Sequence, residues 1–276
     1  MLCQFTVKNY KSIRDEATFD MQAAAISEHE DRIIKDQDGE MYLPVSAIYG
    51  PNGGGKSNVL AALHTLVAKI LRPLYATEDN EDKVLLQKRI IVEPFAFSDS
   101  KNEPTKFELY FRTKSAEYRY ILHVKRDVVI YESLDRVKLE TGRRSALYTR
   151  DDKGIVLKGA FAKLKVSDDL SKTLTLLSYL GIAYKENVVV KDVLNWFEFG
   201  VDFLNYGNPI QELRMAISTS EDVKHLMLEM IQEMDLDIVD FRVEEKENDR
   251  IEVFTKHLVD DVETELSLSD ESSGTK

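Results

Sequence analysis

The chain has 276 residues, of which 43% are hydrophobic and 31% charged, a balance typical of one large globular domain or two smaller ones. Its formal net charge is −12, which argues against a broad electrostatic grip on nucleic acid but leaves room for a local basic groove. Cys3 is the only cysteine and the five histidines are scattered, so a disulfide framework is excluded and a structural zinc site is not indicated.

The sequence carries no sign of a membrane or export segment. Its N-terminus lacks the apolar core of a signal peptide, and no stretch approaches the about 18 uncharged apolar residues of a membrane span. We therefore expect a cytoplasmic protein with no membrane partner.

The N-terminal part predicts short strands. Phe5 and Val7 lie on one face of an opening strand that turns at Asn9–Ser12, and Phe19 and Met21 continue a second strand. Residues 27–42 are mostly polar and predict a loop or a hairpin. The apolar run Val45–Tyr49 predicts a buried strand.

The next residues fit the P-loop pattern G-x-x-x-x-G-K-S/T at every fixed position. Glycines let the backbone turn tightly so that N–H groups point at phosphates, and the following helix N-terminus adds partial positive charge. Lys56 is expected to reach the β- and γ-phosphates, and the Ser57 hydroxyl to hold Mg²⁺. A glycine-rich turn without a ligand is the weaker alternative, since both flanks also fit. The motif residues are Gly50, Pro51, Asn52, Gly53, Gly54, Gly55, Lys56 and Ser57.

A helix is predicted after the P-loop, ending near Arg72 because Pro73 cannot continue it. From Arg89 to about Leu157 the pattern alternates, with short polar links, and predicts an antiparallel meander. The predicted strands are Ile90–Val92 with Phe95–Phe97, Lys106–Arg112, Glu117–Val124 and Val128–Tyr131.

Helical spacing returns in the second half. Helices are predicted from Leu174 to about Gly181, over Val188–Phe199, and after Ser220, which caps an amphipathic helix reaching Met234. Its methionines favour packing within the protein over a groove for a partner. Strands are predicted at Ile238–Val243 and Ile251–Phe254.

The last six residues, Glu271-Ser272-Ser273-Gly274-Thr275-Lys276, look like the signature motif of ABC-type ATPases. In that class the motif serves the neighbouring subunit, where a small hydroxyl and a free backbone donor at a helix start clamp the γ-phosphate on the partner's P-loop. Such a string alone would be a flexible loop. The resemblance makes Ser272, Ser273 and Gly274 candidates for ATP contact in trans.

With both motifs, the chain resembles prokaryotic ABC/SMC-like AAA ATPases, relatives of the overcoming-lysogenization-defect and anticodon-nuclease-associated ATPases of anti-phage systems. The resemblance implies ATP and Mg²⁺ as cofactors, with Asn58 accompanying the P-loop. It also implies a homodimer around ATP and an effector nuclease or toxin as partner. A DNA-repair- or recombination-type ATPase is the alternative function. The supporting segments are Phe5–Ile13, Tyr49–Asn58, Glu93–Phe97, Met234–Ile238 and Glu271–Lys276.

The implied fold class is α/β, a P-loop NTPase of ABC-ATPase head type with an antiparallel β subdomain and an inserted helical lobe. The expected parts are a P-loop core with the β subdomain at 1–158, the helical lobe at 159–235, and return strands with the signature at 236–276. No sustained heptads predict coiled-coil arms.

The sequence departs from the family at its end. In the family a Walker B strand with an Asp-Glu pair and a histidine switch follow the signature, and the sequence ends at Lys276 before either. We expect a truncated head whose catalytic residues are unassigned, with a non-hydrolysing nucleotide-binding scaffold as the alternative. The run Val128–Glu132 resembles a Walker B strand because four apolar residues precede a carboxylate, but we interpret it as an ordinary strand. A GTPase or small-molecule kinase lacks support, since no Asn-Lys-x-Asp guanine reader is present.

Three further residues have two interpretations each. Lys11 and Arg14, in and after the first turn, either approach the nucleotide or form a solvated surface pair. Gln87 is either a metal-facing glutamine or, as we favour, a surface residue.

Overall fold

The computed structural model describes residues 1–24, 30–76, 90–97, 99–167, 169–203, 221–233, 238–246, 250–259 and 262–271. The chain divides into two compact units, residues 1–202 and 203–276. Each unit is considered by itself below.

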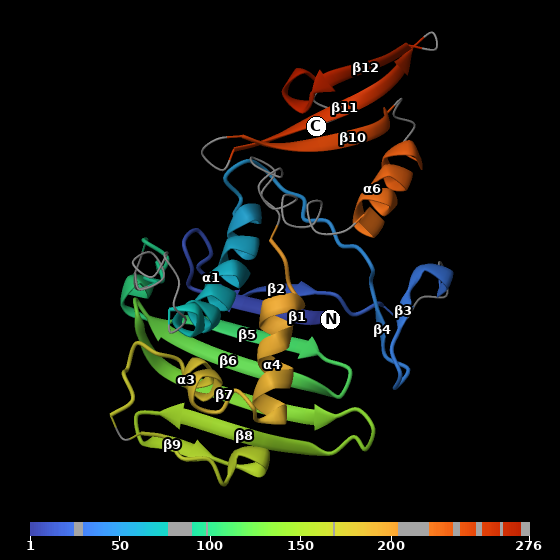
Figure 1. The fold of residues 1–276 in the computed structure, drawn as a ribbon. Helices are drawn as coiled ribbons and strands as arrows, with labels where there is room; N and C mark the ends of the chain where they lie inside the picture. Colours follow the sequence, from blue (N-terminus) through green and yellow to red (C-terminus); the bar gives the residue numbers. More distant parts are fainter. Residues whose placement is uncertain are drawn as a thin grey trace. The chain divides into compact units, whose positions relative to one another are not determined.

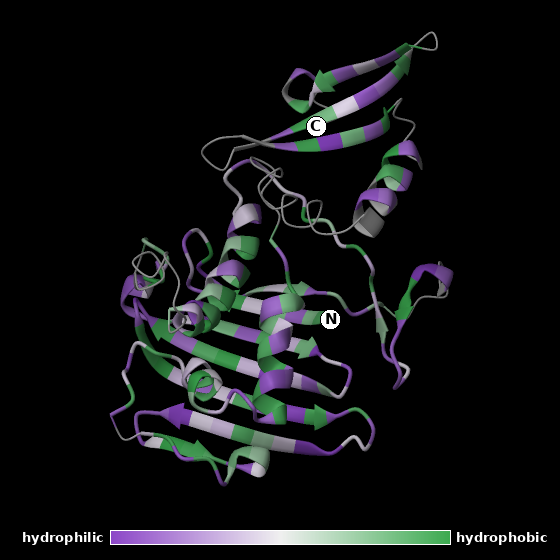
Figure 2. Cartoon of the chain, in the orientation of Figure 1, coloured by the Kyte–Doolittle hydropathy of each residue, from purple (hydrophilic) through white to green (hydrophobic). Residues whose placement is uncertain are grey.

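The first unit is built on a seven-stranded sheet in the order β2-β1-β5-β6-β7-β8-β9, with every neighbouring pair antiparallel (Figure 1). The meander predicted from the alternating pattern is therefore confirmed, and β1 joins it at β5. Buried and less buried residues alternate along β6, and Figure 2 shows both hydrophobic and hydrophilic residues on the strands of the sheet. The strands are β1 (Leu2–Lys8), β2 (Ala17–Asp20), β5 (Thr105–Arg112), β6 (Ala116–Lys125), β7 (Val128–Lys138), β8 (Arg144–Asp151) and β9 (Gly154–Leu157).

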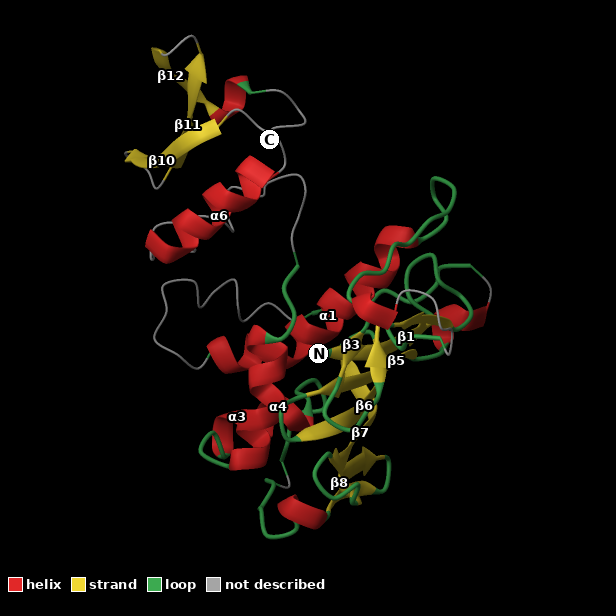
Figure 3. Cartoon of the chain, turned by 90° about the vertical axis from the view of Figure 1, so that its right-hand side faces the viewer, coloured by secondary structure: helices red, strands yellow, loops and turns green. Residues whose placement is uncertain are grey.

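Three helices cover one face of this sheet, as Figure 3 shows from the side. Aromatic rings join the layers: Trp196 stacks on Phe111 with ring centroids 4.3 Å apart, and Phe197 meets Tyr120 edge-on at 6.0 Å. Such pairs add to the free energy gained from apolar burial. The helices are α1 (Lys56–Tyr75), α3 (Leu176–Ala183) and α4 (Val188–Phe199), with short 3-10 turns at Glu30–Arg32, Asp99–Asn102 and Gly159–Phe161.

Two helices end slightly later than predicted, at Tyr75 in place of Arg72 and at Ala183 in place of Gly181. Helix α1 continues through Pro73 to Tyr75. Proline removes one N–H from the last turn, but the Ala76 N–H still bonds to the Arg72 carbonyl, and the fully buried Leu66 and Ile70 hold the helix on the sheet. Helix α3 continues past Gly181 to Ala183. The glycine serves close packing there, since a Cβ at Gly181 would lie 2.5 Å from a Leu194 methyl carbon of α4.

Two predicted strands are wrong. Residues 45–50 form no strand, with Val45 78% and Tyr49 90% exposed. Residues 90–97 are irregular. Val92 N–H donates to the Arg126 carbonyl, Phe95 N–H donates to the Asn9 side chain, and the Glu93 carbonyl accepts from the Lys11 N–H. A strand forms only beside another strand, and in the described residues neither segment has one.

A small hairpin, β3 (Ile34–Lys35) with β4 (Met41–Tyr42), precedes the P-loop segment and confirms the loop-or-hairpin prediction in the described part of residues 27–42. Arg112 of β5 anchors it, since its guanidinium donates to Asp36 at 2.9 Å and Asp38 at 2.8 Å.

The second unit has a three-stranded antiparallel sheet in the order β10-β11-β12, and α6 packs against β10. The predicted helix and the first two strands are confirmed over the described residues; Ser220 and Met234 lie outside them, and β12 was not predicted. The elements are α6 (Glu221–Glu233), β10 (Ile238–Lys246), β11 (Arg250–Val259), β12 (Val262–Ser267) and the 3-10 turn Leu268–Asp270.

The fold as described is mixed α/β with antiparallel sheets. The units assign α3 and α4 to the first and α6 to the second, whereas the sequence grouped them in one lobe, so the three-part division at 158 and 235 stays a prediction. Among the described helices, none is long and apolar enough to cross a membrane.

Candidate nucleotide-binding site

The P-loop leads directly into α1, as the motif requires. Gly53 and Gly55 adopt left-handed backbone conformations, with φ of +78° and +86°, which glycine accepts without strain. Gly55 is the N-cap of α1, and no side chain caps the first turn. Two other described helices of the unit are capped, α4 by the Asn187 side chain and α3 by that of Thr175. The N-terminus of α1 therefore keeps donors that a phosphate can use.

Lys56 lies across its own loop. Its ammonium donates to the carbonyl oxygens of Gly50 and Pro51, both at 2.8 Å. These partners are neutral, so the ammonium charge is not cancelled by a carboxylate at either contact. A phosphate oxygen offers a stronger, charge-assisted bond, which can draw the lysine from the carbonyls onto a ligand.

Ser57 has an exposed hydroxyl in the first turn of α1, the position expected of a Mg²⁺ ligand. The described residues contain no cluster of three or more His, Cys, Asp or Glu side chains that would hold a metal by themselves. Mg²⁺ is commonly held by few protein groups together with substrate phosphates and water, so this donor set fits an ion that arrives with a nucleotide.

The turn after β1 touches the P-loop through a residue that the sequence did not single out. The Asn58 side-chain N–H donates to the Ser12 hydroxyl oxygen at 2.7 Å. The Lys11 ammonium instead lies 5.5 Å from the centroid of the Tyr10 ring. Arg14 pairs with its neighbour Asp15 at 2.8 Å, and both side chains are exposed, which favours the solvated-pair interpretation for Arg14.

Glu132, the carboxylate of the apparent Walker B run, is completely buried in β7. It accepts hydrogen bonds from the Tyr120 and Tyr148 hydroxyls and from the N–H groups of Leu176 and Leu177 at the start of α3. Burial raises the pKa of Glu132, against the opposing effect of these donors. Its partners are internal, which agrees with the prediction of an ordinary strand.

The signature residues Ser272, Ser273 and Gly274 lie outside the described residues, as does Gln87. Glu271, directly before them, is described, and its side chain is 8% exposed. Its carboxylate lies 2.6 Å from His257 Nε2 and also accepts from the Thr255 hydroxyl. The residue that starts the motif is thus fixed to β11.

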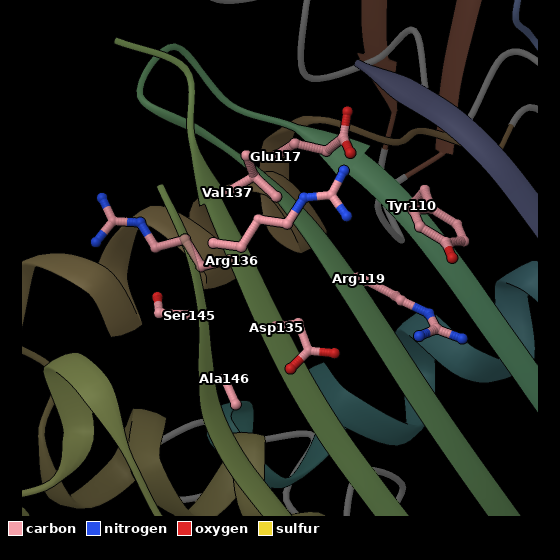
Figure 4. A pocket seen from close by; sticks show the side chains of 9 residues that line it. Tyr110, Glu117, Arg119, Asp135, Arg136, Val137, Ser145 and Ala146 are labelled. Carbon is pink, nitrogen blue, oxygen red and sulfur yellow. The ribbon is translucent and has the colours of Figure 1, made fainter. Parts of the chain in front are cut away.

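A separate hollow of about 500 Å³ lies on the sheet, over β5 to β8 (Figure 4). Two of its charged side chains are already paired, Glu117 with Arg112 and Arg119 with Glu108, each at 2.7 Å. No P-loop residue lines it, so it is distinct from the candidate nucleotide site. Its lining residues are Tyr110, Glu117, Arg119, Asp135, Arg136, Val137, Arg144, Ser145 and Ala146.

Comparison with known proteins gives one family. Residues 45–276 match the family described as "AAA domain, putative AbiEii toxin, Type IV TA system". No curated protein matches the chain. The match includes the whole P-loop and most of the chain, and an AAA domain implies a P-loop NTPase that uses ATP. The chain therefore belongs to this family of AAA domains, ABC-like ATPases of prokaryotic type.

Proposed function

We propose that the chain is an ATP-binding head that dimerises around ATP and regulates an effector in prokaryotic defence. The observation that carries the proposal is the P-loop itself: an uncapped helix N-terminus behind two left-handed glycines, with a lysine beside the loop whose ammonium donates to two neutral carbonyls. Together these groups bind a polyphosphate through backbone N–H donors and one cation.

Each residue of the motif has a distinct role in this proposal. The backbone from Gly53 to Ser57 surrounds the phosphates, and Lys56 moves from the carbonyls of Gly50 and Pro51 to the β- and γ-phosphates. The Ser57 hydroxyl binds Mg²⁺, which neutralises phosphate charge. Asn52 within the loop and Asn58 directly after it are its polar companions.

Dimerisation is proposed from the second motif. Ser272, Ser273 and Gly274 of one subunit contact the γ-phosphate held by the P-loop of the other. Support comes from their resemblance to the ABC signature and from the partly buried contacts of Glu271 with His257 and Thr255, which hold the start of the motif. The effector role is supported by the toxin–antitoxin description of the family.

A non-hydrolysing scaffold is the second candidate. The observation that favours it is the structural role of Glu132, since the carboxylate that most resembles a Walker B residue is engaged by α3 and by two tyrosines. ATPase turnover by the purified chain, abolished in Lys56→Ala, would exclude this candidate. ATP binding without turnover would favour it.

Nucleotide-dependent association tests the dimer. Sedimentation velocity with ATP and Mg²⁺ is expected to show a dimer that Gly274→Arg prevents, because the bulky side chain blocks the clamp while leaving the P-loop intact. A sedimentation coefficient that is the same with and without ATP would contradict the dimer.

A further inference from the structure

The turn that follows β1 and the P-loop are joined across 46 residues of sequence by one hydrogen bond. The Asn58 Nδ2 group donates to Ser12 Oγ at 2.7 Å. Asn58 is the third residue of α1, so this bond ties the first helical turn behind the phosphate loop to the turn after β1.

The same hydroxyl also lies against the last glycine of the loop. A Cβ built on Gly55 would lie 2.9 Å from Ser12 Oγ, closer than such contacts normally occur. Ser12 thus packs on the backbone of the N-cap residue while it holds the Asn58 side chain. These two contacts lie on either side of Lys56 and Ser57 in the sequence.

The turn that carries Ser12 is fixed by several independent bonds. Tyr10 and Ile13 exchange two backbone hydrogen bonds, at 2.8 and 2.7 Å. The Tyr10 hydroxyl meets Thr65 Oγ1 of α1 at 2.8 Å. The Asn9 side chain, 1% exposed, donates to the Ser100 carbonyl and accepts from the Phe95 N–H. Ser12 therefore projects from a rigid base.

The Ser12–Asn58 bond itself is exposed to solvent. Exposed bonds between neutral side chains add little to the stability of a fold, because water replaces either partner. What the bond does supply is a fixed orientation of the P-loop end relative to the sheet, which matters when several N–H groups must converge on one phosphate.

We propose that Ser12 is a positioning residue for phosphate binding, holding Gly55 and Asn58 so that the first turn of α1 presents its donors in the binding geometry. The inference rests on the proposed ATP binding. It assigns no contact between Ser12 and the nucleotide. Losing the bond should therefore cost affinity for the phosphate chain and leave the stability of the free protein unchanged.

The test is a double-mutant cycle of Ser12→Ala and Asn58→Ala, with affinity for ATP and for tripolyphosphate measured by calorimetry with Mg²⁺. Each single variant is expected to bind both ligands about three- to tenfold more weakly, the range of one modest hydrogen bond. Both substitutions break the same bond. The double variant should therefore lose no more affinity than the single variant that binds more weakly.

A matched control is available in the same segment. Thr6 and Thr18 form another exposed hydroxyl pair, 3.0 Å apart, between β1 and β2. Thr18→Ala should bind both ligands as the wild type does, and the urea midpoints of Ser12→Ala and Thr18→Ala should agree with the wild type.

Three results would overturn the inference alone: unchanged affinity in Ser12→Ala, losses that add in the double variant, or a lowered urea midpoint in Ser12→Ala but not in Thr18→Ala. If the wild type bound ATP as weakly as Lys56→Ala does, the result would overturn the proposed ATP site and this inference with it.

Discussion

Gly55 is under two constraints, a left-handed φ of +86° and the Ser12 hydroxyl against its α-carbon. Gly39, in the turn of the β3–β4 hairpin, has nearly the same φ of +88° but open space around it. We predict that Gly39→Ala lowers the free energy of unfolding by about 1 kcal/mol, the cost of the backbone conformation alone. Gly55→Ala should lower it by about 2–3 kcal/mol because a steric term is added.

Urea unfolding followed by the fluorescence of Trp196, the single tryptophan and a core residue of the first unit, measures both variants. Equal losses in the two variants would contradict the close contact at Gly55.

Glu132 should be a structural residue and not a catalytic one. Its two oxygens accept four hydrogen bonds, and Arg150 lies 3.9 Å away. In Glu132→Gln an amide N–H₂ group replaces one carboxylate oxygen, so that it faces an N–H or O–H donor that the oxygen had accepted from. We predict a loss of about 2–4 kcal/mol in unfolding free energy, because a buried donor is left unpaired. ATP affinity of the folded variant, measured by calorimetry, should not change.

Asp135 lies three residues further along β7 and is only partly buried, which makes Asp135→Asn the matched control with a loss within about 0.5 kcal/mol. If Glu132→Gln kept full stability and lost ATPase turnover instead, Glu132 would have to be assigned to the chemistry.

The β3–β4 hairpin should be sensitive to acid. The hydrogen bond from Arg112 holds the pKa of Asp38 below its usual value. A carboxyl whose pKa is lowered by folding stabilises the fold when the pH is above its pKa in the unfolded chain. This contribution is lost as the pH falls through its pKa in the folded protein. We predict that unfolding free energy falls below about pH 4, and that Asp38→Asn removes about 1–2 kcal/mol at neutral pH and flattens this fall.

Asp15 is the control for this effect. The pKa of its carboxyl is also lowered by a neighbouring arginine, but both groups of that pair are exposed, so solvent screens their interaction. An Asp15→Asn variant with the same pH profile as Asp38→Asn would argue against the anchoring role of Arg112.

The elements show which parts of the fold a sequence can predict. Strands β5 to β7 were evident because alternating side chains and short links fix antiparallel neighbours locally. The absence of a strand at residues 45–50 was not evident from the sequence, because an apolar run forms a strand only when a neighbouring strand is present to pair with it. Pro73 and Gly181 predict helix ends near Arg72 and Gly181, and the packing of α1 and α3 carries both helices a little further.

In the whole molecule, the P-loop was predictable and its surroundings were not. The motif is contiguous, so the loop and the helix that follows it could be predicted from the sequence, whereas the bonds from Lys56 to the Gly50 and Pro51 carbonyls could not. The Ser12–Asn58 bond and the links from Glu132 to α3 join residues 46 and 44 positions apart, and no local pattern marks them. The turn at Asn9–Ser12 was recognised, but its contact with the P-loop depends on how β1 joins the sheet.

Nucleotide binding at the P-loop is the claim on which the proposed dimer and the role of Ser12 depend. Calorimetric titration of the purified chain with ATP and Mg²⁺ tests it directly. The expected result is a single saturable site that prefers ATP over GTP, abolished in Lys56→Ala and weakened at least about tenfold in Ser57→Ala when Mg²⁺ is present, through loss of its ligand. Unaltered binding in Lys56→Ala, or no binding by the wild type, would contradict the account.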